Sequence, residues 1–260
     1  MQTIYVVSTG PGGYADMSVA AKETIEKSDV VVGYTKYLKD IGKIIEGKER
    51  HSTGMTAEIE RVNIAIEKAL EGKVVSLVSN GDVNVFGLAT LLVEIVEARG
   101  LWDRLEVVSL PGVTSFFAAA SLCGAPISQD FAVISLSDRL TPLESIEKRI
   151  KAAFEADFVV GIYNPLSKSR KIPYELFLRY LSAINPETPV CVATDLGRAE
   201  QCVRIMDASA LVSMGVETKE IDMSTVILVG NSSSRFTSNG KILTPRGYLD
   251  KYSLEFLRNS

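Results

Sequence analysis

The fold is decided by two stretches, DFAVISLSDRLTP at residues 130–142 and DFVVGIYNP at residues 157–165. Each begins as a run of apolar and β-branched residues, which is typical of a buried strand. Each run then stops abruptly at polar, turn-forming residues, and an amphipathic segment at 143–156 between them predicts a helix. The pattern therefore predicts two neighbouring strands whose carboxyl ends belong to one binding surface.

The same alternation of short strands and amphipathic helices extends through the first half of the chain. Its expected strands are residues 4–8, 30–32, 74–78 and 106–110. Its expected helices are residues 18–27, 57–71 and 87–98. Strands that alternate with helices predict an α/β fold, with a mainly parallel sheet covered on both faces.

The second half is predicted to be mixed α/β. Its expected strands are residues 131–136, 158–163, 189–194, 201–205 and 225–230, with an edge strand at 241–244. Its expected helices are residues 115–122, 143–156 and 174–183. Only about six residues separate the strands at 189–194 and 201–205, which is too few for a parallel crossover.

The best domain boundary is the segment PGV at residues 111–113, which follows a strand and precedes a helix. We therefore expect an N-terminal α/β domain at residues 1–110, a linker at 111–113, and a C-terminal domain at 114–250. A chain of 260 residues is long enough for two domains of ordinary size.

Composition limits the class of protein. With 46% hydrophobic and 23% charged residues the chain reads as globular, and its net charge of −4 disfavours nucleic-acid binding. No apolar run reaches the roughly 18 residues that span a bilayer, and no signal peptide is expected. The three cysteines form no CxxC pair, so we expect no metal site and a reducing, cytoplasmic location.

The first strand ends in TGPGGYA at residues 9–15, which satisfies the loose dinucleotide-binding pattern GxGxxA. Two details oppose that reading. Pro11 removes a backbone N–H that would donate to pyrophosphate, and the second strand ends at Gly33-Tyr34 without an acid for a ribose hydroxyl. A tight turn, which glycines permit for steric reasons, is the alternative.

Two further strand ends carry chemistry-bearing residues. At Gly81 the backbone can approach a ligand closely, and Asp82 can accept hydrogen bonds from a ligand or simply start a turn. Thr114 or Ser115 is expected to cap the next helix beside a cleft.

The strand at 158–163 ends in Asn164-Pro165 and is followed by the basic residues Lys168, Arg170 and Lys171. Such a cluster is either a solvated face or an anchor for a ligand with carboxylates. The only histidine, His51, is expected in a polar loop and is not expected to be catalytic, because a metal site or a triad needs further partners.

Taken together, these loops resemble those of the tetrapyrrole methylase family, whose members use S-adenosylmethionine. The resemblance covers roughly residues 3–250. It rests on these segments: GPG at 10–12, DVVVGY at 29–34, TGM at 53–55 with Glu58 and Arg61, SNGD at 79–82, LPGVT at 110–114, GR at 197–198, DMST at 222–225, GNS at 230–232 and TPRGY at 244–248. The two opening stretches resemble the branch that methylates carbon 17 of precorrin-3B or cobalt-factor III during cobalamin biosynthesis.

The resemblance implies two α/β domains with the cofactor in a cleft between them. Matched position by position, it implies that S-adenosylmethionine is contacted by these residues: Pro11, Asn80, Gly81, Asp82, Val85, Thr114, Ser115, Tyr163, Asn164 and Leu196. It further implies a homodimer with a small-molecule tetrapyrrole substrate, which carries cobalt in one of the two pathways. The composition described above adds the expectation of neither nucleic acid nor membrane as a partner.

Methylation in this branch accompanies contraction of the ring, a step that an acid or base can assist. The candidates for that role are Asp82, Glu58, Arg61 and Asp138. Because the substrate carries many carboxylates, the candidates for anchoring it are Arg139, Lys168, Arg170, Lys171 and Arg198.

The chain departs from the family pattern in three places. Ser8 stands where the first glycine of the Gly-x-Gly-Pro-Gly loop is usual, and NGDVNVFG at 80–87 replaces the usual SGDPGVYG. TDL at 194–196 replaces the common Arg-Asn-Ala. We interpret these as changes in the shape of the cofactor loops.

Three alternatives remain open at this point. One is another precorrin methylase or a diphthamide-type methylase of the same superfamily. The second is a Rossmann-type oxidoreductase with a nicotinamide cofactor. The third is a non-catalytic binding or scaffold protein, which the altered residues Val83 and Asn84 make more credible.

Overall fold

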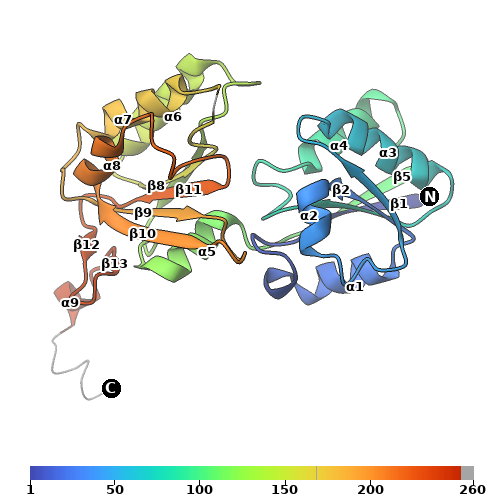
Figure 1. Cartoon of the computed structure of the whole chain (residues 1–260), viewed down its shortest axis with the longest axis horizontal. Helices are drawn as coiled ribbons and strands as arrows, with labels where there is room; N and C mark the ends of the chain where they lie inside the picture. Colours follow the sequence, from blue (N-terminus) through green and yellow to red (C-terminus); the bar gives the residue numbers. More distant parts are fainter. Residues whose placement is uncertain (168, 253–260) are drawn as a thin grey trace. The chain divides into compact units, whose positions relative to one another are not determined.

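The computed structural model describes residues 1–167 and 169–252 (Figure 1). Its contacts divide the chain into two compact units. Unit 1 contains Met1–Ser115 together with Leu196–Ala199, and unit 2 contains Phe116–Asp195 and the described residues from Glu200 onward. The structure thus divides the chain between residues 115 and 116, and it adds to the first unit a short segment that lies far along the sequence.

Unit 1 is built on a five-stranded sheet with the strand order β3-β2-β4-β1-β5. The strands are β1 (Gln2–Ser8), β2 (Val30–Tyr34), β3 (Glu49–Thr53), β4 (Val75–Ser79) and β5 (Leu105–Leu110). Every neighbouring pair is parallel, which confirms the predicted parallel sheet. The loops that follow the five strands therefore all leave from the same edge of the sheet.

Helices cover both faces of this sheet because its strands are apolar on both sides. The helices are α1 (Val19–Lys27), α2 (Thr35–Asp40), α3 (Glu58–Leu70) and α4 (Ala89–Ala98). Successive strand residues point to opposite faces, so Val6 belongs to the core with Ile66 of α3, while Val7 belongs to the core with Ile25 of α1. All four side chains are fully buried.

The prediction of a polar loop around His51 is wrong, because Glu49–Thr53 is an edge strand paired in parallel with β2. Most of its side chains are exposed, and for this reason it lacks the apolar run that marks a buried strand. His51 accordingly contacts Glu49 on the same strand, with 2.7 Å between its Nε2 and the carboxylate oxygen.

Unit 2 contains a mixed five-stranded sheet with the order β10-β9-β11-β8-β7. The strands are β7 (Phe131–Ser135), β8 (Val159–Tyr163), β9 (Pro189–Thr194), β10 (Cys202–Asp207) and β11 (Thr225–Val229). The two stretches that open the sequence analysis form β7 and β8, which are parallel neighbours. The remaining pairs are antiparallel, including β9 with β10, as the short connection between them predicts.

The helices of unit 2 are α5 (Ser115–Cys123, whose first residue belongs to unit 1), α6 (Leu143–Glu155), α7 (Ile172–Leu181), α8 (Ala208–Met214) and the short α9 (Tyr248–Lys251). The α/β class is thus confirmed for both halves. The strand expected at 241–244 is present as β13 (Ile242–Leu243), but its predicted edge position is wrong, because β13 is the middle strand of a separate small sheet. Its neighbours there are β12 (Arg235–Phe236) and β6 (Gly124–Ala125), and Ile242 is fully buried between them.

One glycine allows α5 to pack against the sheet of unit 2. Gly161 lies in the middle of β8, and a Cβ atom at this position would come 2.4 Å from the ring of Phe116. Phe116 is fully buried, and its ring also contacts the rings of Phe117 and Phe131. Because no side chain fits at position 161, the helix can lie close to the strand.

We expect Gly161→Ala to lower the free energy of unfolding by about 1–3 kcal/mol, because the added methyl group overpacks the contact with Phe116. Urea unfolding followed by circular dichroism measures this. The matched control is Gly54→Ala, where a Cβ meets nothing within 4 Å and φ is not positive. An equal stability for the two variants would show that the Gly161 contact does not constrain the fold.

Candidate functional site

Three loops at the carboxyl edge of the sheet of unit 1 are bound to one another. They follow β1, β4 and β5 and comprise residues 8–13, 79–87 and 110–115, which we call the three-loop cradle. Gly10 and Gly81 exchange two main-chain hydrogen bonds, of 3.2 and 2.9 Å, as in an antiparallel bridge. Both glycines have positive φ angles, 68° and 67°, which favour glycine at these positions.

Asp82 joins the second loop to the third. One carboxylate oxygen accepts a hydrogen bond from the N–H of Gly112 at 2.9 Å, and the other accepts from the N–H of Asn84 at 2.8 Å. A Cβ on Gly112 would lie 2.4 Å from the Cβ of Ser8 and 2.7 Å from the carbonyl oxygen of Gly81. The predicted cofactor residue Asp82 is therefore a structural link between main-chain segments that can contact a ligand.

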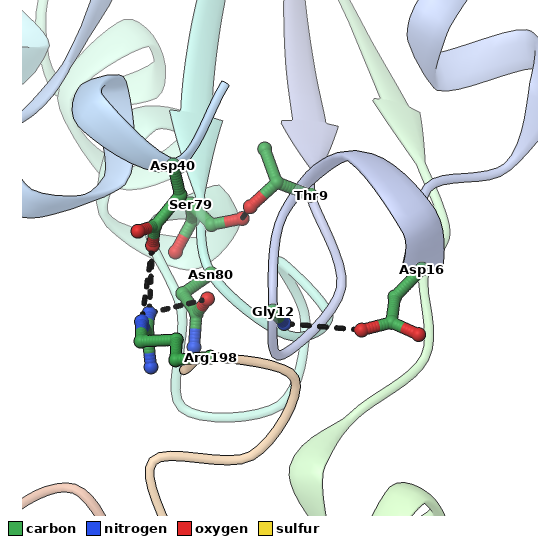
Figure 2. A network of polar contacts seen from close by, with 7 residues as sticks. All are labelled: Thr9, Gly12, Asp16, Asp40, Ser79, Asn80 and Arg198. Carbon is green, nitrogen blue, oxygen red and sulfur yellow. Dashed lines mark hydrogen bonds and ion pairs between the residues drawn. The ribbon is translucent and has the colours of Figure 1, made fainter. Parts of the chain in front are cut away.

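Leu196–Ala199 completes the cradle from a distant part of the sequence. Gly197 lies directly against Gly12, because a Cβ on Gly12 would come within 2.3 Å of its Cα. Arg198 donates to Asp40 Oδ2 at 2.8 Å from Nη2 and 3.2 Å from Nε, and Nη2 also donates to Asn80 Oδ1 at 3.2 Å. Figure 2 shows the guanidinium bonded to both of these side chains.

The ion pair between Arg198 and Asp40 is well shielded, with side chains 12% and 17% exposed. The sequence predicts Arg198 as a substrate anchor, whereas these contacts orient it toward the cradle itself. Leu196, one of the expected cofactor contacts, is buried in the same unit. The segment thus brings two of the predicted residues to the loops after β1 and β4.

The glycine-rich turn after β1 does not have the geometry of a dinucleotide-binding loop. The N–H of Gly12 donates to the carboxylate of Asp16 at 3.2 Å (Figure 2), so a carboxylate of the chain takes the place that a phosphate would need. A single 3-10 turn, η1 (Tyr14–Asp16), follows the glycines, and α1 begins only at Val19, with Ser18 as its N-cap. The tight-turn interpretation fits this geometry.

An open hollow of about 470 Å³ lies in unit 1 beside the cradle. It is lined by Ala15, Asp16, Met17, Ser18, Pro111, Gly112 and Val113. Val113 is 43% exposed, so the hollow offers apolar surface to a ligand. The remaining expected cofactor contacts of this unit lie in the cradle: Pro11 and Thr114 are buried, and Asn80, Val85 and Ser115 are partly exposed.

In unit 2, the carboxyl ends of β7 and β8 are joined as the sequence predicts. Asn164 adopts a left-handed conformation with φ 51°, and its side-chain amide donates to the hydroxyl of Ser135 at 2.9 Å. Tyr163, the last residue of β8, accepts a hydrogen bond at its hydroxyl from the N–H of Phe116, in the first turn of α5, at 2.8 Å. Both predicted residues thus have defined positions at this edge.

Arg170 lies at the same edge of the second sheet. Its Nη1 donates to the hydroxyl of Ser137 at 2.9 Å and lies 3.6 Å from the carboxylate of Asp138. Two predicted residues with different assigned roles, substrate anchor and acid or base, therefore form an ion pair. Arg139 is exposed beside them, and Lys168 lies outside the described residues.

Lys171 makes a separate ion pair with Glu217, at 2.5 Å. It therefore differs from Arg170, whose guanidinium contacts the turn after β7. Of the basic residues predicted to anchor substrate, the structure places Arg170 and Arg139 near Asp138, and it gives Lys171 a different partner.

Arg61 is a buried structural residue of unit 1, with only 4% of its surface exposed. Its Nε donates to Thr53 Oγ1 at 2.8 Å and its Nη2 donates to the carbonyl of Gly54 at 2.9 Å. Burial lowers the pKa of Arg61, and the nearby carboxylate of Glu58 opposes that shift. These contacts hold the turn between β3 and α3, and Glu58 itself is only partly exposed in the first turn of α3.

Within residues 1–167 and 169–252 no cluster of three or more His, Cys, Asp or Glu side chains is placed to bind a metal ion. Over the same residues no helix has both the length and the hydropathy needed to cross a bilayer.

Four polar residues that organise these sites were not predicted individually as cofactor, substrate or acid–base residues: Ser8, Asp40, Ser135 and Ser137. Ser8, Ser135 and Ser137 lie at or just after strand ends, a signal that could have found them. Ser8 was noted only as a departure from a pattern. Asp40 ends a helix that the sequence analysis did not predict, and no local signal identifies its partner Arg198, which lies 158 residues away.

Comparisons with known proteins agree with this geometry. Residues 3–212 match the family model described as Tetrapyrrole (Corrin/Porphyrin) Methylases. A probable cobalt-factor III C(17)-methyltransferase of Methanocaldococcus jannaschii is 41% identical over 254 residues, which cover 96% of this chain and 100% of that protein. A precorrin-3B C(17)-methyltransferase of Sinorhizobium sp is 33% identical over 254 residues, covering 95% of this chain and 97% of the relative.

A longer relative, the cobalamin biosynthesis protein CbiHC of Archaeoglobus fulgidus, is 41% identical, and the match covers 96% of this chain but 54% of that protein. Among solved structures, the crystal structure of the methyltransferase CobJ superposes with a TM-score of 0.85 at 33% identity, over 94% of this chain and 100% of CobJ. From its sequence, its fold and these matches, the chain belongs to the tetrapyrrole (corrin/porphyrin) methylase family.

Proposed function

We propose that this protein transfers a methyl group from S-adenosylmethionine to carbon 17 of precorrin-3B or cobalt-factor III, with contraction of the ring, in cobalamin biosynthesis. Relatives that carry these names match nearly the whole chain. The observation that carries the proposal is the three-loop cradle, in which main-chain segments from β1, β4 and β5 are held together at one edge of a parallel sheet. Ligands of open α/β sheets bind at this edge.

The residues of the cradle fit S-adenosylmethionine. A Cβ at Gly81 would lie 3.8 Å from the Cα of Thr114, so the missing side chain leaves space in the cradle at that point. The loops combine an amide at Asn80, a carboxylate at Asp82 and buried apolar surface at Pro11. This set suits a ligand with a cationic centre, ribose hydroxyls and an adenine ring. Tyr163 and Asn164 of unit 2 are proposed as further contacts.

When bound, the cofactor supplies an activated methyl group on its sulfonium, and the reaction needs chiefly alignment of donor and acceptor. We propose that the linked loops provide this alignment, because hydrogen bonds fix each loop to the next. The hollow beside Val113 would offer apolar surface to a ligand bound in unit 1. Arg170 and Arg139 would bind its carboxylates.

The contacts divide the four acid–base candidates into two groups. Arg61 and Asp82 already use their polar atoms to hold main-chain segments, which favours a positioning role for both. Asp138 pairs with Arg170, but its side chain is 33% exposed. Because of this exposure, its carboxylate is accessible to a substrate. Glu58 is the remaining candidate. We propose Asp138 as the group that assists ring contraction.

The family resemblance extends the proposal to a homodimer that acts in the cytoplasm. A particle with twice the mass of one chain in size-exclusion chromatography with light scattering would support the homodimer.

The proposed reaction is tested by incubating the purified protein with cobalt-factor III, or with precorrin-3B, and S-adenosylmethionine labelled in its methyl group. We expect one labelled methyl group per macrocycle, at carbon 17, by mass spectrometry and NMR. Label at a different ring carbon would indicate another methylase of the superfamily, and label on neither macrocycle would contradict the proposal.

Asp82→Ala is expected to weaken binding of S-adenosylhomocysteine by about tenfold or more, because two main-chain N–H groups of the cradle lose their acceptor. Isothermal titration calorimetry measures the dissociation constant. Asp207→Ala is the matched control, since Asp207 also accepts a main-chain N–H, from Ala210 at 2.7 Å, but caps a helix of unit 2. Wild-type affinity in Asp82→Ala would remove this residue from the site.

Replacing Arg170 and Lys171 together with alanine is expected to raise the KM for the macrocycle about tenfold, while the affinity for S-adenosylhomocysteine stays unchanged. The single variants separate their contributions, and the contacts predict that Arg170→Ala carries most of the effect. Arg179→Ala, which removes an exposed arginine of α7 paired with Glu147 of α6, is the control. An unchanged KM in the double variant would exclude this basic pair from substrate binding.

A further inference from the structure

Two of the departures from the family pattern lie in contact with each other. The hydroxyl of Ser8, at the end of β1, accepts a hydrogen bond from the N–H of Val83 at 3.0 Å. Both residues are fully buried, so water cannot replace either partner. In the usual pattern these positions hold a glycine, which has no hydroxyl, and a proline, which has no N–H. The two departures are therefore chemically complementary.

Val83 occupies a position in the chain where proline would also fit. The N–H of Val85 donates to the carbonyl of Asp82 at 3.1 Å, which closes a four-residue turn with Val83 as its second residue. Proline is favoured at this position of common turns because its ring fixes φ there in advance. With valine the backbone loses that restriction and also gains an N–H group that must be satisfied inside the protein.

The Ser8 hydroxyl meets both needs. It satisfies the N–H of Val83, and it fixes the start of the turn to the end of β1. Ser8 lies two residues before Gly10, and Val83 lies two residues after Gly81, so this hydrogen bond is close to the bridge between the two glycines. The close approach of Ser8 to Gly112 places the same side chain against the third loop. The hydroxyl of Ser8 therefore holds the second loop of the cradle, while its Cβ packs against the third loop.

We propose that Ser8 is a positioning residue, whose hydrogen bond to Val83 replaces the rigidity of a proline and keeps the loop at 79–87 in the geometry that binds S-adenosylmethionine. This inference rests on the proposed function for the identity of the ligand. The altered loop is still held by this hydrogen bond, so the change at Val83 does not by itself favour a non-catalytic scaffold.

The first test is Ser8→Ala, which removes only the hydroxyl. We expect the dissociation constant for S-adenosylhomocysteine to rise about tenfold, because the buried N–H of Val83 loses its acceptor. In turnover, the KM for S-adenosylmethionine rises while the KM for the macrocycle changes little. Amide exchange in the peptide that contains Val83 becomes faster without any ligand.

The control for this variant is Ser76→Ala. Ser76 is an equally buried serine of the same sheet, and its hydroxyl bonds to that of Ser28 at 2.7 Å, away from the cradle. A loss of stability alone would appear in both variants. A selective loss of cofactor affinity in Ser8→Ala identifies the positioning role.

The sharper test exchanges both partners. Val83→Pro alone places a ring carbon where the N–H meets the Ser8 hydroxyl, and it is expected to bind S-adenosylhomocysteine at least tenfold more weakly. Ser8→Gly alone leaves the N–H without an acceptor and is expected to bind weakly as well. The double variant Ser8→Gly/Val83→Pro removes the hydroxyl and the N–H together, and it is expected to return to within about threefold of the wild-type affinity.

Two results would overturn the inference. One is wild-type affinity and wild-type exchange at Val83 in Ser8→Ala, and the other is a double variant that binds no better than the weaker single variant. Failure of the proposed function gives a different result, namely a wild-type protein that shows no binding of S-adenosylhomocysteine. In that case Ser8 has no cofactor loop to position and the inference falls with it, whatever the exchange data show.

Discussion

The hydrogen bonds among the loops after β1, β4 and β5 are the constraint on which the rest of unit 1 depends. A parallel sheet brings the carboxyl ends of its strands to one edge, where each loop begins with main-chain groups that have no partner in the ladder. In this protein the loops satisfy one another through the pair Gly10 and Gly81 and through the side chains of Ser8 and Asp82. As a result, the three loops are fixed to one another at the edge of the sheet.

The distant segment Leu196–Ala199 follows the same principle. Gly12 and Gly197 meet backbone to backbone, and the charge of Arg198 is balanced by Asp40 in a partly buried position. A side chain at either glycine would separate the two segments. The two glycines thus allow the backbone segments at residues 12 and 197 to touch, and Arg198 fixes the orientation of the segment Leu196–Ala199.

In unit 2 the corresponding edge is organised by side chains. Ser135, the last residue of β7, binds Asn164, and Ser137, two residues later, binds Arg170. Asp138 follows directly and pairs with Arg170. A charged and exposed surface results, which suits a substrate that bears carboxylates.

Much of this could be predicted because it depends on local patterns. The apolar runs of β1, β4, β7 and β8 give the sheets, and polar residues at their ends mark the binding edges. The strand β3 escaped prediction because an exposed edge strand carries polar residues such as Glu49 and His51. The contacts of Arg198 could not be found in this way, since they depend on the approach of two glycines that are 185 positions apart, at 12 and 197.

The roles of the predicted site residues show a similar division. Residue type and position at a strand end were enough to select Asp82 and Asn164. They could not show that Asp82 uses both carboxylate oxygens to hold its neighbours, or that Arg170 and Asp138 pair. Such partners are determined by the register of strands and the course of loops, and these are properties of the folded chain.

The central claim, that the three linked loops form the cofactor site, is tested most directly by hydrogen–deuterium exchange of the wild-type protein with and without S-adenosylhomocysteine. The account predicts slower exchange on ligand addition in peptides that cover residues 8–13, 79–87 and 110–115, and no change in the edge strand Glu49–Thr53. Protection confined to other segments, with these three loops unchanged at saturating ligand, would contradict it.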